Sequence, residues 1–211
     1  MKRFLRQLVP HRLRARIGEM RSVTSAARRT YLARQLRRAF GVRDDHAIAP
    51  LSGTRRVLFV CHGNIIRSPM AEAMLRRKSE ELAPGALTIE SAGTHARAGR
   101  EADRRAIALA PEFGLDLARH SARPLSREII DAAELIFVMD RLNESELLAR
   151  FPDAAPKVRL LGAFGRRPDE SDCAIPDPYM EDEEAVRHCY RRLERALEIV
   201  VRALHPSAVG R

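Results

Sequence analysis

Short apolar runs alternate with amphipathic stretches from about residue 55 to residue 204. The runs predict buried strands, and the stretches, whose apolar residues recur every three or four positions, predict helices. The predicted strands are residues 56–60, 87–91, 135–139 and 158–161, and the predicted helices are residues 68–82, 102–109, 143–151 and 183–204. Continuously apolar strands that alternate with helices are typical of a parallel sheet covered on both faces. We therefore predict an α/β fold, a three-layer sandwich with a four-stranded parallel sheet.

The last predicted helix has the clearest apolar stripe. Its members fall at three- and four-residue steps and are Val186, Cys189, Leu193, Leu197, Val200 and Leu204. A single stripe on a long helix packs against a core, so we expect these side chains to be buried.

Charge sets the N-terminal quarter of the chain apart from the rest. Residues 1–56 hold 15 Lys and Arg against 3 Asp and Glu, whereas the remaining residues hold 23 against 25. The net charge of +10 therefore comes from the N-terminal segment. We predict a basic extension and linker over residues 1–54 and one folded domain over residues 55–211.

The basic extension has apolar residues at helical steps through residues 1–40, although Pro10 must interrupt the first stretch. We therefore predict a helical basic arm. Such an arm can lie on an anionic membrane surface or dock on an acidic protein, and nucleic acid is the least favoured partner. A poorly ordered extension and a transit peptide also stay open.

The three cysteines are widely spaced at positions 61, 173 and 189, which fits neither a disulfide framework nor a zinc-binding Cys-x-x-Cys pair. No apolar stretch reaches the roughly 18 residues needed to span a bilayer. We expect a cytoplasmic protein, peripheral to the membrane if the arm binds lipid, because a reducing compartment keeps thiols available.

A phosphate-binding loop is predicted directly after the first strand. The loop Cys61-His62-Gly63-Asn64-Ile65-Ile66-Arg67 leads into Ser68-Pro69, where Ser can cap a helix and Pro fits its first position. Gly63 and Asn64 tolerate positive φ, so the backbone N–H groups can curl inward around a phosphate dianion at the helix N-terminus. Arg67 would add a two-pronged contact to the phosphate, and the positive field favours the nucleophilic thiolate of Cys61.

The spacing of Cys61 and Arg67 is not specific by itself. Cys189 and Arg195 have the same spacing, but they lie within the last predicted helix, have no Gly between them and place the cysteine on the core stripe. The strand before Cys61, the Gly-Asn pair after it and the helix start at Ser68 distinguish the first site from this accidental one.

Residues 60–69 with Ala71-Glu72 resemble the nucleophile loop of low-molecular-weight protein-tyrosine phosphatases. The family's second landmark, Asp-Pro-Tyr, is matched by Asp177-Pro178-Tyr179. Between these two landmarks, three further segments follow the family's order, namely residues 91–94, 120–123 and 138–140. The resemblance covers about residues 55–204, and it implies that residues 55–211 form the catalytic domain.

The resemblance implies hydrolysis of phosphomonoesters, above all protein phosphotyrosine, through a phosphocysteine on Cys61. Asp177 would be the general acid and base, and neither a metal nor an organic cofactor is expected. Ser68 would donate a hydrogen bond to the sulfur. The remaining expected site residues bind substrate or support the loop: His62, Gly63, Asn64, Ile65, Ile66, Tyr179, Ser91 and His120.

Two positions depart from the family pattern. Ile66 stands where many members have a second loop cysteine, and residues 95–100 lack the aromatic residue that often forms one wall of the cleft. Arg97 would line that wall instead. The preference for phosphotyrosine over other phosphomonoesters therefore stays more open than the phosphatase reaction itself.

Two alternative functions stay open. An arsenate reductase of the same fold needs further relay cysteines, and none lies between Cys61 and Cys173. A non-catalytic phosphate-binding regulatory module would have lost the nucleophile, the arginine or the acid, yet all three are present. The use of 35 Arg against 3 Lys indicates a GC-rich genome, which favours a bacterial source.

Overall fold

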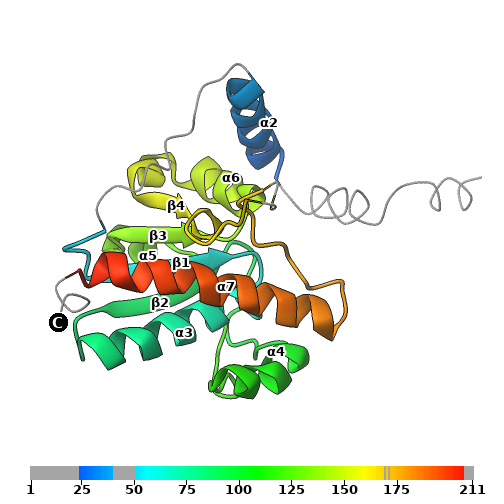
Figure 1. The fold of residues 1–211 in the computed structure, drawn as a ribbon. Helices are drawn as coiled ribbons and strands as arrows, with labels where there is room; N and C mark the ends of the chain where they lie inside the picture. The colour runs from blue at the N-terminus through cyan, green and yellow to red at the C-terminus, as the bar shows by residue number, and fades with distance from the viewer. Residues whose placement is uncertain (1–23, 40–50, 169, 171, 207–211) are drawn as a thin grey trace, which may run out of the picture.

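The computed structural model of the chain describes residues 24–39, 51–168, 170 and 172–206 (Figure 1). Most of the predicted arm and linker, namely residues 1–23 and 40–50, lies outside the described residues. The predicted boundary between an extension at residues 1–54 and a domain at residues 55–211 therefore stays a prediction.

The sheet has four strands, all parallel, in the order β2-β1-β3-β4. The strands are β1 (Arg56–Cys61), β2 (Thr88–Gly93), β3 (Leu135–Val138) and β4 (Val158–Leu160). The predicted α/β fold with a four-stranded parallel sheet is confirmed, and each strand lies within two residues of its expected bounds.

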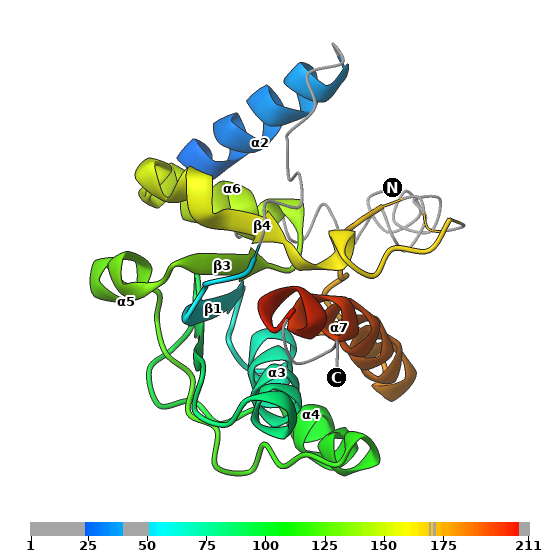
Figure 2. The same ribbon diagram turned by 60° about the vertical axis from the view of Figure 1, so that its left-hand side comes forward.

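Helices cover both faces of the sheet (Figures 1 and 2). One face carries α3 (Arg67–Leu82), α4 (Arg104–Leu109) and α7 (Glu183–Leu204), and the opposite face carries α5 (Arg127–Ala132) and α6 (Arg141–Arg150). Short 3-10 turns complete the fold at Ala110–Phe113, Pro152–Lys157 and Leu161–Ala163. Alternate side chains of β1 enter the two cores, because Val57 and Phe59 pack with one set of helices and Leu58 and Val60 with the other.

The strand order creates a crevice at the end of β1. The chain passes from β1 to β2 on one side and then returns to β3 on the other side of β1. In open parallel sheets this reversal leaves a crevice outside the carboxyl ends of the strands, where ligands bind. Cys61 is the last residue of β1 and therefore lies at this position.

Helix α7 matches its predicted bounds, and the six residues of its apolar stripe are each at most 5% exposed. Burying a side chain such as Leu193 contributes about 1.5–3 kcal/mol relative to leaving it in water. Asp182 caps the helix, since its carboxylate accepts a hydrogen bond of 2.9 Å from the backbone N–H of Ala185.

Helix α5 was not predicted. It has only six residues, so its two apolar residues, Ile129 and Ile130, cannot display a helical period. The Ser126 side chain caps it by accepting a hydrogen bond from the backbone N–H of Ile129.

Helix α2 (Ser25–Ala39) belongs to the predicted arm and lies beside α6 (Figures 1 and 2). An ion pair of 2.9 Å joins Arg34 of α2 to the buried Glu144 of α6, and Ala27 is fully buried. Leu32 and Leu36 are 53% and 60% exposed. In the part of the chain that the structure describes, no helix is both long enough and apolar enough to cross a membrane.

Candidate active site

The loop from β1 to α3 curls around the sulfur of Cys61. The backbone N–H of Asn64 lies 3.2 Å from Sγ, and the Ser68 hydroxyl lies 3.0 Å from it. Asn64 has a φ of +53°, in the left-handed region that Asn tolerates better than most residues. Of the two residues expected to tolerate positive φ, Asn64 adopts it and Gly63 does not.

A different glycine allows the loop to form. At Gly93, the end of β2, a Cβ atom would lie 2.7 Å from the carbonyl oxygen of His62 and 2.9 Å from the backbone nitrogen of Asn64. A side chain at this position would collide with the phosphate loop, so the loop can lie against β2 only because residue 93 is glycine.

The predicted helix start lies within one residue of the observed one, but the expected capping role of Ser68 was wrong. Helix α3 begins at Arg67, and its N-cap residue, Ile66, makes no side-chain capping hydrogen bond. The hydroxyl of Ser68 is directed to the cysteine sulfur instead of to the helix backbone.

The amide of Asn64 determines which way that hydroxyl donates. Its Oδ1 accepts a hydrogen bond of 2.8 Å from the backbone N–H of Arg123, which fixes the orientation of the amide. Its Nδ2 donates to Ser68 Oγ at 2.9 Å and to Ser91 Oγ at 2.8 Å. Ser68 therefore keeps its own proton, which it can donate to Cys61 Sγ at 3.0 Å or to a carbonyl oxygen at 3.4 Å.

Two further side chains anchor this network. Ser91 donates to the carboxylate of Glu72 at 2.6 Å, which leaves its oxygen free to accept from Asn64. His120 Nε2 lies 2.7 Å from the carbonyl oxygen of Asn64 and must donate, since a carbonyl oxygen only accepts. Ser91 and His120 thus contact the loop where the resemblance implied, whereas Glu72 was not expected to act as an anchor.

Arg67 is almost fully buried and is held between two carboxylates. Its Nη1 donates to Asp140 at 2.5 Å and to the carbonyl oxygen of Ile175 at 3.2 Å, and its Nη2 pairs with Asp177. Burial opposes the charge of the guanidinium, but the carboxylates of Asp177 and Asp140 outweigh it and raise the pKa of Arg67.

This arrangement brings together Cys61, Arg67 and Asp177, which are far apart in the sequence. Asp140 was not among the expected site residues. Its position could have indicated it, because it follows β3, the strand next to β1, and the carboxyl ends of parallel strands meet at one edge.

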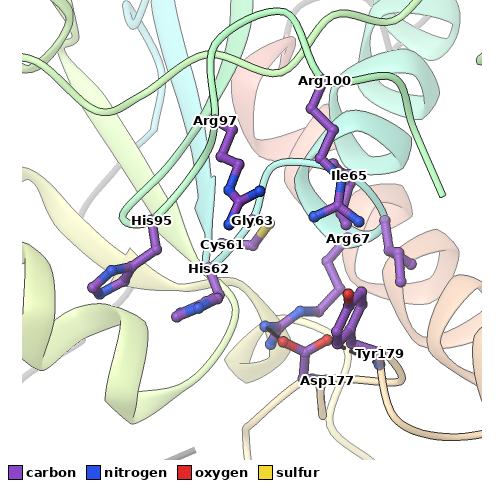
Figure 3. Close-up of a pocket in the computed structure, with 11 residues that line it drawn as sticks. Cys61, His62, Gly63, Ile65, Arg67, His95, Arg97, Arg100, Asp177 and Tyr179 are labelled. Carbon is purple, nitrogen blue, oxygen red and sulfur yellow. Dashed lines mark hydrogen bonds and ion pairs between the residues drawn. The ribbon is translucent and has the colours of Figure 1, made fainter. Parts of the chain in front are cut away.

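A pocket of about 580 Å³ opens above the loop (Figure 3). It is lined by Cys61, His62, Gly63, Ile65, Ile66, Arg67, His95, Arg97, Arg100, Asp177 and Tyr179. Figure 3 shows Arg67, Asp177 and Tyr179 together at one end and the imidazoles of His62 and His95 side by side at the other. Arg97 lines the pocket as expected.

The segment that carries Asp177 and Tyr179 is tied down by Arg105, which sequence reasoning did not identify. The guanidinium of Arg105 donates to the carbonyl oxygen of Tyr179 at 3.0 Å and to that of Glu181, and Asp103 orients it at 2.9 Å. Arg100 faces the Tyr179 ring at 5.9 Å, so a cation stands opposite the aromatic wall of the pocket.

The two imidazoles lie next to a buried carboxylate. The carboxylate of Glu146, 3.8 Å from Nδ1, raises the pKa of His62, against the opposing effect of burial. Burial alone would raise the pKa of Glu146, but His62, the Thr94 hydroxyl and His95 together lower it. Neither His95 nor Glu146 was predicted, because neither belongs to a motif within its own segment and only the fold brings them together.

The two remaining cysteines differ from Cys61. Cys189 is fully buried on α7, and burial raises the pKa of its thiol to about 12. Cys173 is partly buried on the segment before Asp177, and all three thiols are free. Only Cys61 lines the pocket.

The site has a cysteine at the end of a parallel strand, a loop whose Asn64 N–H points to the cysteine sulfur, and a buried arginine. These features define the site of a cysteine-dependent phosphatase. The chain matches the family described as low molecular weight phosphotyrosine protein phosphatase over residues 56–208. The Escherichia coli low molecular weight protein-tyrosine-phosphatase Wzb is 37% identical over 153 residues, which cover 72% of this chain and 97% of that protein.

Solved structures show the same fold. Vibrio vulnificus Wzb in complex with benzylphosphonate has a TM-score of 0.63 and 32% identity, over 72% of this chain and 100% of that one. The YwlE arginine phosphatase from Geobacillus stearothermophilus has a TM-score of 0.64 and 33% identity, over 74% of this chain and 96% of that one. The chain belongs to the low molecular weight phosphotyrosine protein phosphatase family, and it is a protein-tyrosine phosphatase.

Proposed function

We propose that the chain hydrolyses phosphotyrosine in proteins, with Cys61 as nucleophile, Arg67 as phosphate ligand and Asp177 as general acid and base. The observation that carries this proposal is the convergence of the three side chains on one pocket, with the Cys61 sulfur at its base and the Arg67–Asp177 pair at its side.

In the first step, the backbone N–H groups of the loop and the guanidinium of Arg67 bind the phosphoryl oxygens. The Cys61 thiolate attacks phosphorus, the bond from phosphorus to the tyrosine oxygen breaks, and Asp177 donates a proton to that oxygen. Nη1 of Arg67 is already held by Asp140 and a carbonyl oxygen, whereas Nη2 pairs with Asp177. The phosphate therefore competes with Asp177 for Nη2. This competition frees the Asp177 carboxyl for proton transfer.

In the second step, Asp177 takes a proton from a water molecule, whose oxygen attacks the phosphocysteine. The bond between sulfur and phosphorus breaks, inorganic phosphate leaves, and the sulfur returns as a thiolate. The Ser68 hydroxyl donates a hydrogen bond to that thiolate. Its oxygen already accepts a hydrogen bond from Asn64, so its proton is free to point to the sulfur.

Hydrolysis of p-nitrophenyl phosphate in reducing buffer tests the mechanism. We expect activity that is inhibited by vanadate, abolished in Cys61→Ser and reduced in Asp177→Ala. Activity that is unchanged in Cys61→Ser would exclude the proposed nucleophile, and an inactive wild-type protein would favour a non-catalytic phosphate-binding module.

The phosphorylated residue that the enzyme hydrolyses needs a separate test, because one similar structure is an arginine phosphatase. Tyr179 supplies an aromatic wall against which a phenyl ring can pack, and this residue is 44% exposed at the rim of the pocket. We expect a phosphotyrosine peptide to be hydrolysed faster than a phosphoarginine peptide of the same sequence. The reverse order would refute the substrate class and leave the cysteine mechanism intact.

We also propose that the protein works in the reducing cytoplasm and that its basic arm docks on an anionic membrane surface or an acidic protein. The excess of positive charge in residues 1–56 and the exposed Leu32 and Leu36 of α2 support this role. Co-sedimentation with anionic liposomes should be stronger for the full chain than for a chain that starts at Arg55. Equal sedimentation would exclude membrane docking by the arm.

A further inference from the structure

Two histidines and a glutamate meet at one end of the pocket, although they come from three separate elements. His62 follows β1, His95 follows β2, and Glu146 lies on α6. One ligand atom from each side chain lies within 4.8 Å of the other two. His95 Nε2 is 2.7 Å from Glu146 Oε1, and His62 Nδ1 is 3.8 Å from Glu146 Oε2.

Glu146 is buried without a permanent cation beside it. Its side chain is 3% exposed, and within the described residues its ion pairs are with the two imidazoles alone. Glu144, two residues earlier on α6 and equally buried, pairs with Arg34 at 2.9 Å and with Arg141 at 3.0 Å. A buried carboxylate is costly without a positive partner, and either a protonated imidazole or a bound cation can supply that charge here.

We propose that His62, His95 and Glu146 bind a zinc ion. Two imidazole nitrogens and one carboxylate oxygen form a three-ligand set that zinc accepts in a tetrahedral site with one open position. Imidazole ligands favour zinc over magnesium and calcium, which prefer oxygen ligands throughout.

A bound zinc ion would require the side chains to rotate. Zinc bonds of about 2.0–2.2 Å place tetrahedral ligand atoms roughly 3.4 Å apart. His95 Nε2 lies 2.7 Å from Glu146 Oε1 and His62 Nδ1 lies 3.8 Å from Oε2, so the rings must turn toward one shared carboxylate oxygen. The side chains of His62 and His95 are 38% and 36% exposed, so their rings can turn and an ion can reach them from the pocket.

An outer contact already orients the carboxylate. The Thr94 hydroxyl donates to Glu146 Oε2 at 2.6 Å, and Thr94 is itself buried. Hydrogen bonds of this kind to a ligating carboxylate are a regular part of zinc sites, because they fix the ligand before the metal arrives.

The site forms part of the wall of the phosphatase pocket, since both histidines line it next to Cys61 (Figure 3). Because the Cys61 thiolate can also bind zinc, the test must separate the two ligands. The full chain with Cys61→Ser removes the thiolate and is catalytically inert, so metal binding is measured independently of the proposed reaction.

Isothermal titration of Zn²⁺ into the Cys61→Ser protein, without an affinity tag, should show one equivalent bound. In that background, His95→Gln and Glu146→Gln should each weaken binding at least about tenfold. His188→Gln is the matched control, because His188 is exposed on α7 and is not part of the cluster; it should leave the affinity unchanged.

Zinc should also raise the Tm of Cys61→Ser and raise it less when His95→Gln is added, since a ligand that binds only the folded state stabilises it. If Glu146→Gln does not fold, His95→Gln tests the site alone, because the partly exposed His95 is not part of the core. Loss of all zinc binding in Cys61→Ser would place the ion on the thiolate and overturn the proposal. Binding that is unaffected by His95→Gln would overturn it as well.

Discussion

The hydroxyl of Ser68 offers the sharpest test of the proposed mechanism. Ser68→Ala removes the hydrogen bond of 3.0 Å to the Cys61 sulfur, together with the hydrogen bond of 2.9 Å that the hydroxyl accepts from Asn64 Nδ2. A hydrogen bond to a charged group contributes about 1.5–3 kcal/mol, and each 1.36 kcal/mol corresponds to a tenfold change in rate. If the hydroxyl stabilises the departing thiolate, kcat should fall about 10- to 150-fold.

The step that slows is also predicted. The hydrogen bond helps the sulfur leave but is not required for its attack on phosphorus, so phosphocysteine should accumulate in Ser68→Ala. Rapid mixing with p-nitrophenyl phosphate should then show a burst of nitrophenolate equal to the enzyme concentration, followed by slow turnover.

Ser79→Ala is the matched control. Ser79 is a buried serine on the same helix, and its hydroxyl makes one side-chain hydrogen bond, 3.0 Å to His205 Nε2. Its replacement should lower stability by about 1–3 kcal/mol and leave kcat unchanged. A kcat of Ser68→Ala within twofold of wild type, with no burst, would refute the role of the hydroxyl.

Three other predictions concern the surroundings of the loop. Asp140→Ala removes one of the two carboxylates that hold Arg67, so kcat/KM should fall at least about tenfold and urea unfolding should show a loss of about 1–3 kcal/mol; unchanged values in both assays would contradict the anchoring role. Iodoacetamide at pH 8 should alkylate Cys61 before Cys189, whose pKa of about 12 leaves on the order of one thiolate in ten thousand; peptide mapping that finds Cys189 modified first would show the opposite. Gly93→Ala should destabilise the protein by about 1–3 kcal/mol and lower kcat, because its Cβ would meet the loop backbone at 2.7 Å; thermal unfolding and activity measure the two effects, and a fully stable, active variant would show that β2 can move away.

The sequence predicted those elements of the fold that a pattern of neighbouring residues specifies. The strands are apolar throughout because helices cover both faces of the sheet, and α7 shows a stripe because one of its sides is buried. The phosphate loop could be located because it lies between a strand and a helix. Helix α5 escaped prediction because six residues are too few to show a period.

The rest of the site depends on contacts between distant segments. Asp140, Glu146 and His95 are unremarkable in their own segments and become site residues only when the sheet brings three strand ends together. The local reading of Ser68 as a helix cap failed for a related reason: its hydroxyl has a better partner in the cysteine sulfur, which the helix signal cannot reveal.

The isoleucine at position 66 determines how the enzyme withstands oxidants. Peroxide converts an accessible thiolate to a sulfenic acid, which a neighbouring thiol can capture as a reversible disulfide. The phosphate loop holds Cys61 as its single sulfur, and the thiol of Cys189 is a poor nucleophile in its buried position on α7. Cys173 packs against the core on the other face of the sheet, whereas Cys61 belongs to the first core. We therefore expect peroxide to carry Cys61 on to the sulfinic acid, so that inactivation is permanent and the lifetime of the enzyme under oxidative stress depends on its replacement rather than its repair.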